Sequence, residues 1–288
     1  NFMLGFADST GVGLVENVGT NRNSFRNSEN LSMQSGFKIG RSIDVTLRFS
    51  SDNSRNQTTQ ITGDQSFSAY KVSEDQQPIP FPEWSVRWTG VEKIPIIKDW
   101  TKRVSFDHSF TGKSTEAWQN DESNITRKSY NASFRPLLGM NITFKNDIST
   151  TVRYNLSNTF EENVRGGSGG RRSTNSDFSV QAKYSKSGGF RFPIPVWPFK
   201  NKEFKNDMDF SFAFSMSSNV DEQNMMGGKW EEMNKTTKWS LKPQLTYRFS
   251  TNVSGGVHFE YGKNESKRMG KTSFQDFGLN VRIDIRGR

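Results

Sequence analysis

The sequence predicts an all-β protein, an antiparallel transmembrane β-barrel with short periplasmic helical or Pro-rich connections between some strands. Two observations predict this class. Apolar and polar residues alternate with a period of two over much of the chain, and helical periodicity is nearly absent. The stretch DMDFSFAFSMSS, residues 207–218, places large apolar side chains at every second position and mostly small polar groups between them. Because successive side chains of a strand point to opposite faces, such a strand has one apolar face and one polar face.

The composition excludes several other classes. The chain has 288 residues, 32% of them apolar, with a mean hydropathy of −0.78 and a formal net charge of +9. These values are typical of disorder, but an aromatic share of 13% and the strict alternation oppose it. There is no run of about 18 apolar residues that would predict a transmembrane helix. Cysteine is absent, which excludes disulfides and thiolate metal sites. Residue 1 is Asn and no signal peptide opens the sequence, so we expect part of a longer or processed chain.

About ten strands follow from the positions of the alternating apolar residues. The first apolar set spans residues 31–49, and residues 57–72 hold a weaker candidate. Residues 1–29 are expected to be loop or irregular. The remaining sets lie at residues 84–88, 104–110, 130–144, 148–160, 178–184, 208–216, 239–249, 253–261 and 277–285. Several segments are longer than the 5–6 residues usual for soluble strands and fit the roughly 9–11 that a tilted membrane strand needs.

The connections between these strands are predicted to be unequal. Tight turns are expected at KND, residues 145–147, and STN, residues 250–252; long polar loops are expected at about 119–128, 161–176, 218–236 and 262–272. Tight turns at one end and long loops at the other are the pattern of outer-membrane barrels. Two Pro-containing connections, GVEKIP from residue 90 and SGGFRF from residue 187, fall at the tight-turn end. Residues 90–103 are expected to hold a short helix or helical turn, with Ile94 and Ile97 on one face with Trp100.

The two faces of the strands are expected to meet different surroundings. Residues predicted to face lipid are Met208, Phe210, Phe212, Phe214, Trp239, Leu241, Tyr247, Phe249, Phe277, Leu279, Val281 and Ile283. Residues predicted to face a wet lumen are Asp209, Ser211, Arg135, Arg153, Arg248 and Arg282. A soluble β-sandwich, in which two sheets pack their apolar faces together, would also alternate and is the competing fold.

One segment, residues 78–119, resembles a known family; it reads PIPFPEWSVRWTGVEKIPIIKDWTKRVSFDHSFTGKSTEAWQ. Members of the SprA family, also called Sov, carry a strand ending in W-x-[VL]-x-[WY]-x-G-[LV]-x-K-I-P, a short helical element and a rising strand with a histidine. The matching positions here are Trp84, Val86, Trp88, Gly90, Val91, Lys93, Ile94, Pro95 and His108. FKNDMDFSFAF, residues 204–214, and the tail from Trp239 also resemble the C-terminal strands of that family, so the resemblance covers most of residues 30–286.

The resemblance implies a location and a function. The family forms the giant outer-membrane translocon of the type IX secretion system, which serves protein secretion and gliding motility in Bacteroidetes-type bacteria. Residues 1–288 would then be one arc of a larger barrel, in a pore wide enough to pass folded proteins. The implied partners are a PorV-like shuttle barrel, a plug protein that seals the lateral opening, and cargo proteins with C-terminal secretion domains. Membrane lipids and lipopolysaccharide are the expected surroundings.

Patterns for other functions are weak. GGSGG, residues 166–170, matches G-x-S-x-G without the strand–turn–helix context of a nucleophile, and TGKST, residues 111–115, lacks the first glycine of a P-loop. On a strand, Asp107 and Ser109 share one face while His108 points away, which prevents a local triad. We therefore expect no enzyme and no catalytic, cofactor or metal site. The basic residues form no stripe with aromatics, so nucleic acid is not an expected partner; clusters at 169–173 and 263–271 are solvated loops or contacts to lipopolysaccharide phosphates. The competing function is a small free-standing outer-membrane barrel, an enzyme or an adhesion barrel.

Overall fold

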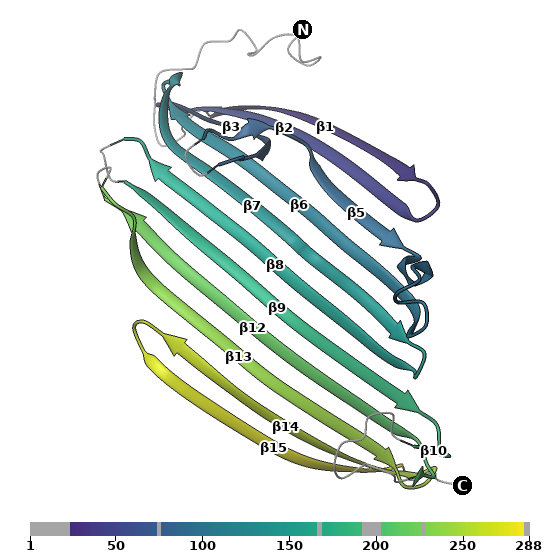
Figure 1. Cartoon of the computed structure of the whole chain (residues 1–288). Coiled ribbons are helices and arrows are strands. Elements are labelled where there is room, and N and C mark those ends of the chain that lie inside the picture. Colours follow the sequence, from purple (N-terminus) through teal and green to yellow (C-terminus); the bar gives the residue numbers. More distant parts are fainter. Residues whose placement is uncertain (1–23, 74–75, 166–168, 192–202, 226–227, 285–288) are drawn as a thin grey trace.

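The computed structural model describes residues 24–73, 76–165, 169–191, 203–225 and 228–284, which form an all-β structure (Figure 1). The element order is β1 (Phe25–Ile39), β2 (Ile43–Gln57), β3 (Ile61–Tyr70), β4 (Ile79–Pro80), β5 (Glu83–Thr89), the 3-10 helix η2 (Val91–Lys93), β6 (Thr101–Gln119), β7 (Asp121–Phe144), β8 (Ile148–Asn163), β9 (Gly170–Lys186), β10 (Phe190–Arg191), β11 (Glu203–Phe204), β12 (Met208–Asn224), β13 (Glu231–Arg248), β14 (Val253–Ser266) and β15 (Gly270–Ile283). All strands except the β10–β11 pair belong to one 13-stranded sheet.

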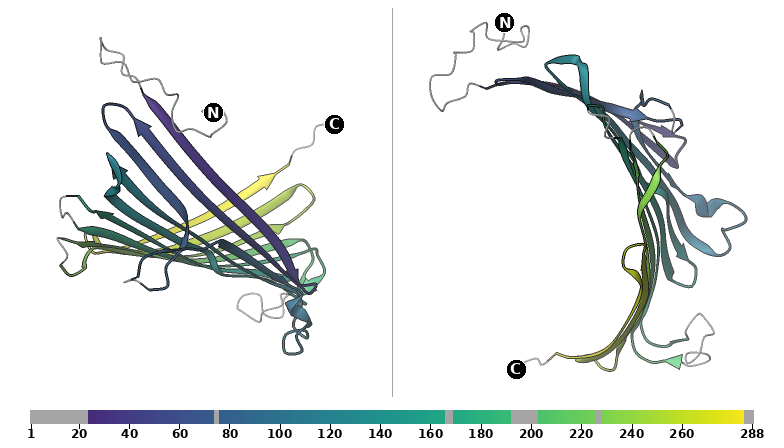
Figure 2. Two further views of the ribbon diagram at one scale, coloured as in Figure 1. Left: turned by 90° about the horizontal axis from the view of Figure 1, so that it is seen from above. Right: turned by 90° about the vertical axis from the view of Figure 1, so that its left-hand side faces the viewer.

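Within the described residues this sheet is a single antiparallel layer, with β1 and β15 as its edge strands. Its strand order is β15-β14-β13-β12-β9-β8-β7-β6-β5-β2, with β1 on the far side of β2. The long strands lie side by side in Figure 1, and the right-hand view of Figure 2 shows the sheet as an arc. In the part of the chain that the structure describes, β1 pairs only with β2 and β15 only with β14. The predicted all-β antiparallel fold is therefore confirmed, and within the described residues the sheet does not close on itself.

The first predicted apolar set is a hairpin of two strands. β1 and β2 pair in register from Phe25↔Gln57 to Ile39↔Ile43, around a turn at residues 40–42. The turn contains Gly40 with a φ of 64°, a conformation that glycine adopts without strain. β1 also begins at Phe25, so the expectation of irregular structure for residues 25–29 was wrong.

One position in the sheet is shared by two separate strands. We call the end of the sheet that carries the turn at 145–147 the lower end. Between β2 and β6, β5 occupies the lower half and β3 the upper half, and both run in the same direction. Residues 71–82 connect β3 to β5 and are an insertion in one composite strand, in which only the short β4 pairs back with the end of β3.

The upper connections are shorter than predicted, because the strands continue through residues that were assigned to loops. β6 ends at Gln119 and β7 begins at Asp121, which leaves only Asn120, with a φ of 68°, between them. The other three hairpins pair as far as Glu162↔Gly170, Gln223↔Glu231 and Ser266↔Gly270. The prediction of four long loops was thus wrong. The tight turns at 145–147 and 250–252 and the described ends of both Pro-containing connections lie at the lower end, as predicted.

No second sheet covers the large one within the described residues. Few apolar side chains are buried, and the small core of Tyr184 and Met208 lies at the lower end of the sheet. The only other sheet described is the two-stranded β10–β11 pair. A sandwich needs two sheets with facing apolar surfaces, so this competing fold was wrong for the described chain. Among the described residues, no helix has the length and apolar character needed to cross a membrane.

Candidate functional site

The strand register places the apolar side chains on one face from edge to edge. Directly paired residues project from the same face of a sheet. One continuous row of pairs, the apolar row, runs through Ile39, Ile43, Trp88, Phe106, Met140, Val152, Val180, Phe214, Leu241, Tyr261 and Gln275. The neighbouring row lies on the other face, and we call it the charged row. It runs through Lys38, Asp44, Arg87, Asp107, Gly139, Arg153, Ser179, Ser215, Ser240 and Gly262. One face is thus apolar, and the other is charged or hydroxyl-bearing.

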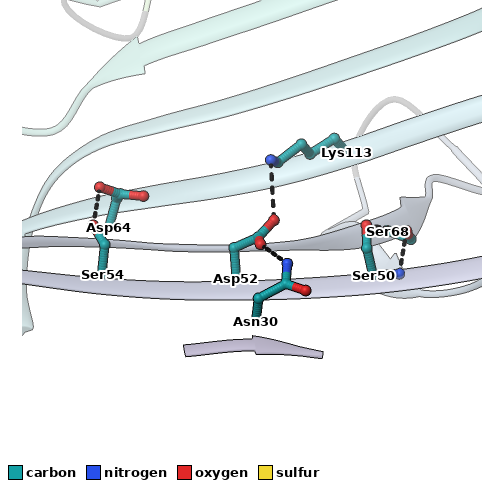
Figure 3. Close-up of polar contacts among 7 residues, drawn as sticks. All are labelled: Asn30, Ser50, Asp52, Ser54, Asp64, Ser68 and Lys113. Atoms are coloured by element: carbon teal, nitrogen blue, oxygen red, sulfur yellow. Dashed lines mark hydrogen bonds and ion pairs between the residues drawn. The ribbon is translucent and has the colours of Figure 1, made fainter. Parts of the chain in front are cut away.

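The polar face is the concave one. Lys113 of β6 reaches across β3 to Asp52 of β2, with 3.5 Å between Nζ and Oδ2, and Asp52 also accepts a hydrogen bond from Asn30 of β1 (Figure 3). A hollow of about 400 Å³ on this face is lined by side chains from five neighbouring strands, β5 to β9, including Glu83 and Arg135. Side chains converge in this way on the inner side of a curved sheet. Phe81, just before β5, lies on the other, apolar face, where its ring is 5.9 Å from that of Trp84.

The residues predicted to face lipid share the convex, apolar face. In the middle of the sheet Met208, Phe210, Phe212 and Phe214 pair with Tyr247, Leu245, Pro243 and Leu241, and Trp239 pairs with Met216. At the edge Phe277, Leu279, Val281 and Ile283 pair with Phe259, Val257, Gly255 and Val253. Phe249 lies in the turn after β13, where its ring meets that of Tyr247 edge-on at 5.2 Å. The paired residues among them therefore project from one face of the sheet.

The residues predicted to face a lumen share the concave face. Asp209 pairs with Thr246 and Ser211 with Gln244. Arg248, Ser254 and Arg282 form one cross-strand series, and Arg153 pairs with Ser179. Arg135 lies in the irregular part of β7 between Phe134 and Leu138 and lines the concave hollow. These six residues therefore lie on the polar face of the sheet, and their predicted contact with a lumen stays a prediction.

In β12 and β9 the apolar face is confined to the lower part of the strand. In β12 the apolar positions run from Met208 to Met216, and beyond them Ser217–Asn224 are polar on both faces apart from Val220. β9 reverses this order, with GRRSTNSD before Phe178. The apolar surface is therefore a band, and the polar upper parts of the strands extend past it.

The band crosses the strands obliquely. In β2 the lowest apolar residue of the band is Ile43, which belongs to the apolar row itself. In β8 the lowest is Ile148, four residues below the row, and in β14 it is Val253, eight residues below the row. From β2 to β14 the lower limit of the band therefore shifts by eight residues, or about 27 Å, along the strands. Over the same eight strand steps it moves about 38 Å across the sheet. These two distances correspond to a strand tilt of about 35° from the normal of the band. With this tilt, the nine-residue segment Met208–Met216 gives a band about 22 Å tall.

The segment that carries the family motif lies beside a cluster of rings. Trp84 stacks on Phe110 at 4.3 Å, and Tyr70 and Phe81 from the ends of the insertion lie 5.7 and 5.9 Å from the Trp84 ring. Phe110 is only 1% exposed. His108 lies on this apolar face, with Nδ1 2.7 Å from the Leu137 carbonyl oxygen. The sequence did not reveal the cluster, because the insertion brings its members together from separate strands.

The other motif residues form the lower end of β5 and the following connection. The Trp88 ring lies 6.0 Å from that of Phe106, and Gly90 has a φ of 75° before η2, which contains Lys93. Pro95 follows in a series of turns in which Ile97 N donates to Ile94 O and Trp100 N donates to Ile97 O. The predicted helical turn is confirmed.

Charged residues on the concave face pair across strands. Lys38 lies 3.3 Å from Asp44, and Arg87 lies 3.1 Å from Asp107, with all four on the charged row. Lys38 and Asp44 face each other across the β1–β2 hairpin, whereas Arg87 and Asp107 lie on separate strands and are matched by the register of β5 and β6. Sequence reasoning missed them because no local signal fixes that register. Each exposed pair contributes roughly 0.2–1 kcal/mol.

The lower end carries a second electrostatic cluster. Asp147, in the turn between β7 and β8, contacts both Lys102 of β6 and Lys186 of β9. Hydrogen bonds from Lys102 and Lys186 lower the pKa of Asp147 to about 2. Glu92 of η2 accepts a 3.0 Å hydrogen bond from Val104 N, and this bond lowers its pKa. The two carboxylates fix the turn and the β5–β6 connection to neighbouring strands.

The described residues form no evident reaction centre. Asp107 lies on the concave face with Arg87, whereas His108 lies on the apolar face, so the two do not form a triad with Ser109. Of GGSGG, residues 166–168 lie outside the described residues, and TGKST is part of β6. No cluster of three or more histidine or carboxylate side chains in the described ranges could hold a metal ion.

No known family model matches the chain, and no curated protein is similar to it in sequence. The geometry therefore defines a curved single-layer sheet with one apolar and one polar face. Any narrower function rests on that geometry and on the motif at Trp84–Pro95.

Proposed function

We propose that residues 1–288 form part of the wall of a large outer-membrane β-barrel that conducts proteins. The observation that carries the proposal is the oblique apolar band on the convex face of a single-layer sheet. Its height of about 22 Å and strand tilt of about 35° match the apolar belt of roughly 25 Å and the tilt of roughly 35–45° typical of outer-membrane barrels. In this setting the convex face contacts lipid and the concave face lines a water-filled pore.

The two free edges favour an arc over a small closed barrel. β1 and β15 each have one neighbouring strand among the described residues, and an open edge in lipid leaves N–H and C=O groups unpaired at several kcal/mol each. The band also reaches both edges, since Leu279 in β15 and Met33 in β1 are 70% and 60% exposed. We infer that further strands continue the wall on both sides. This argues against a free-standing barrel, which remains the competing proposal.

The motif at residues 84–95 supports a narrower proposal. Trp84, Trp88, Gly90, Lys93 and Pro95 resemble the SprA family motif. On that basis we propose a translocon of the type IX secretion system that serves gliding motility in the outer membrane of Bacteroidetes-type bacteria. Its proposed partners are a PorV-like shuttle barrel, a plug protein, and folded cargo with a C-terminal secretion domain. Lipids and lipopolysaccharide would surround the band and the polar strand extensions.

Cysteine labelling in the intact protein tests the two faces. The chain contains no cysteine, so Ser215→Cys and Phe212→Cys each add a single thiol to it. A water-soluble maleimide should label position 215, which lies on the charged row of the concave face. It should not label position 212, which lies in the apolar band. Rapid labelling of both positions in membranes would refute the lipid-facing band, and labelling of position 212 alone would reverse the faces.

Expression of residues 1–288 alone tests the arc. Without outside partners for β1 and β15, the fragment should fail to give a heat-modifiable, protease-resistant monomer in detergent or liposomes. Amide hydrogens of β1 and β15 should exchange faster than those of central strands such as β9. Residues 43–49 belong to β2, which is paired on both sides, and their amide hydrogens should exchange more slowly than those of β1. A compact, fully protected monomer would favour the free-standing barrel.

A further inference from the structure

We propose that the connection between β5 and β6 is a lipid anchor, in which Ile96 and Trp100 insert at the boundary between lipid headgroups and acyl chains. The inference rests on the proposed function, because it requires the convex face to lie in a membrane. It assigns a specific role to a segment that is outside the sheet and does not contribute to the wall.

The connection exposes two large apolar side chains that lie four residues apart in the sequence. Ile96 is 83% exposed and Trp100 is 74% exposed. Single exposed apolar residues are ordinary, but neighbouring ones on a short projecting element form a surface that favours an apolar partner. In a membrane protein, lipid supplies such a partner without a further protein.

Several hydrogen bonds hold this connection in a fixed place. Trp100 O accepts from Lys145 N of the β7–β8 turn at 3.0 Å, and Thr101 Oγ1 donates to Ile97 O at 2.8 Å. Glu92 joins η2 to the backbone of Val104 on the other side. Trp100 is therefore held at the start of β6, at the lower end of the sheet.

The position of the connection suits the edge of a membrane. Figure 2 shows it projecting from the convex side of the sheet. It follows directly on Trp88 of the apolar row, and Phe249 continues the lower rim of the band further along the sheet. Tryptophan and tyrosine concentrate at the membrane–water boundary.

The charges of the connection also fit a lipid surface. Lys93 and Lys98 are exposed beside the apolar side chains, and lysines reach toward lipid phosphates while their stems lie along apolar surface. Exposed Ile and Trp flanked by Lys on a short element are typical of segments that lie in the interface. Because the same rim is continuous with the band, we favour lipid over a docked protein.

Spin labels on the intact protein in lipid nanodiscs of phosphatidylethanolamine and phosphatidylglycerol test the anchor. Ile96→Cys and Trp100→Cys are the test positions, and Asp99→Cys is the matched control on the same exposed connection. Phe212→Cys and Ser215→Cys supply the lipid and water references. Oxygen partitions into lipid and a nickel chelate stays in water. We expect the ratio of oxygen to nickel collisions at 96 and 100 to be several-fold higher than at 99 and close to that at 212.

The references separate failure of the anchor from failure of the proposed function. If position 212 is in lipid while 96 and 100 match 99, the anchor is refuted and the membrane wall stands. If position 212 matches 215, both ideas are refuted. If labels at 96 and 100 are shielded from both reagents, a protein covers the connection, which also refutes a lipid anchor.

Discussion

An arginine in the middle of the apolar band should impair assembly far more than an arginine on the polar face. Phe212 is four residues from each end of Met208–Met216, which places it about 11 Å from either edge of the band at a 35° tilt. Arginine near the midplane of a bilayer costs about 2–4 kcal/mol, which corresponds to a factor of about 30 to 1,000 in the folding equilibrium.

The matched changes lie on the same strand with the opposite orientation. Ser211 pairs with Lys183 and Gln244, so Ser211→Arg adds a like-charge contact that costs at most about 1 kcal/mol. Ser215 pairs with Ser179 and Ser240, so Ser215→Arg lacks even that contact.

The assay is the amount of heat-modifiable intact protein in the outer-membrane fraction. Phe212→Arg should nearly abolish it, Ser211→Arg should lower it slightly, and Ser215→Arg should leave it unchanged. Equal tolerance of Phe212→Arg and Ser215→Arg would refute the assignment of the faces.

Three further predictions concern the ends of the sheet and its close contacts. We expect the upper connections to lie on the cell surface, including the regions around Gly167 and Met226, which are outside the described residues. A protease site inserted between β12 and β13 should be cut in intact cells, and a site inserted at Pro95 should not be cut. The reverse result would mean that the protein has the opposite orientation in the membrane. Asp147→Asn keeps a residue type that tolerates the φ of 67° but removes the carboxylate bound by Lys102 and Lys186. Because the folded pKa of about 2 is below the usual value, the stabilisation is complete above the unfolded pKa of about 4 and is lost as the pH falls toward 2. The free energy of unfolding, measured with denaturant, should fall between about pH 4 and pH 2 in the wild type because of this loss, and the variant should lack this part of the fall. If the two proteins have the same dependence of unfolding free energy on pH, the assigned role of Asp147 is contradicted. Gly112→Ala would place a Cβ 2.1 Å from Ala69 O and should destabilise the protein by about 1–3 kcal/mol, whereas Gly36→Ala, with its nearest atom at 3.7 Å, should be nearly neutral; equal denaturation midpoints would mean that β3 and β6 are not so close.

The faces of the sheet could be predicted from the sequence because a period of two fixes them once a strand is recognised. Met208 to Phe214 and Asp209 to Ser211 fall on the faces expected for them. The same regularity hid the first turn. Ile39 and Ile43 are four residues apart, so the apolar alternation passes unbroken through the turn between them.

The upper parts of the strands were beyond prediction for a different reason. Residues such as Ser217–Asn224 are mostly polar on both sides, and a polar strand resembles a loop in sequence. The ring cluster at Trp84 and the ion pair of Arg87 with Asp107 depend on long-range pairing, which local pattern does not encode. These partners can be matched only when the register of the paired strands is known.

The composite strand makes the sheet tolerant of a break in the covalent chain. β3 is held by β2 and β6 through its own hydrogen bonds, and β5 is held by other residues of the same two strands. A cut within residues 71–78 would therefore leave every pairing of the main sheet in place. The protein could be reconstituted from two co-expressed polypeptides that meet there, and a whole folded domain could be grafted at the same point without shifting the strands on either side.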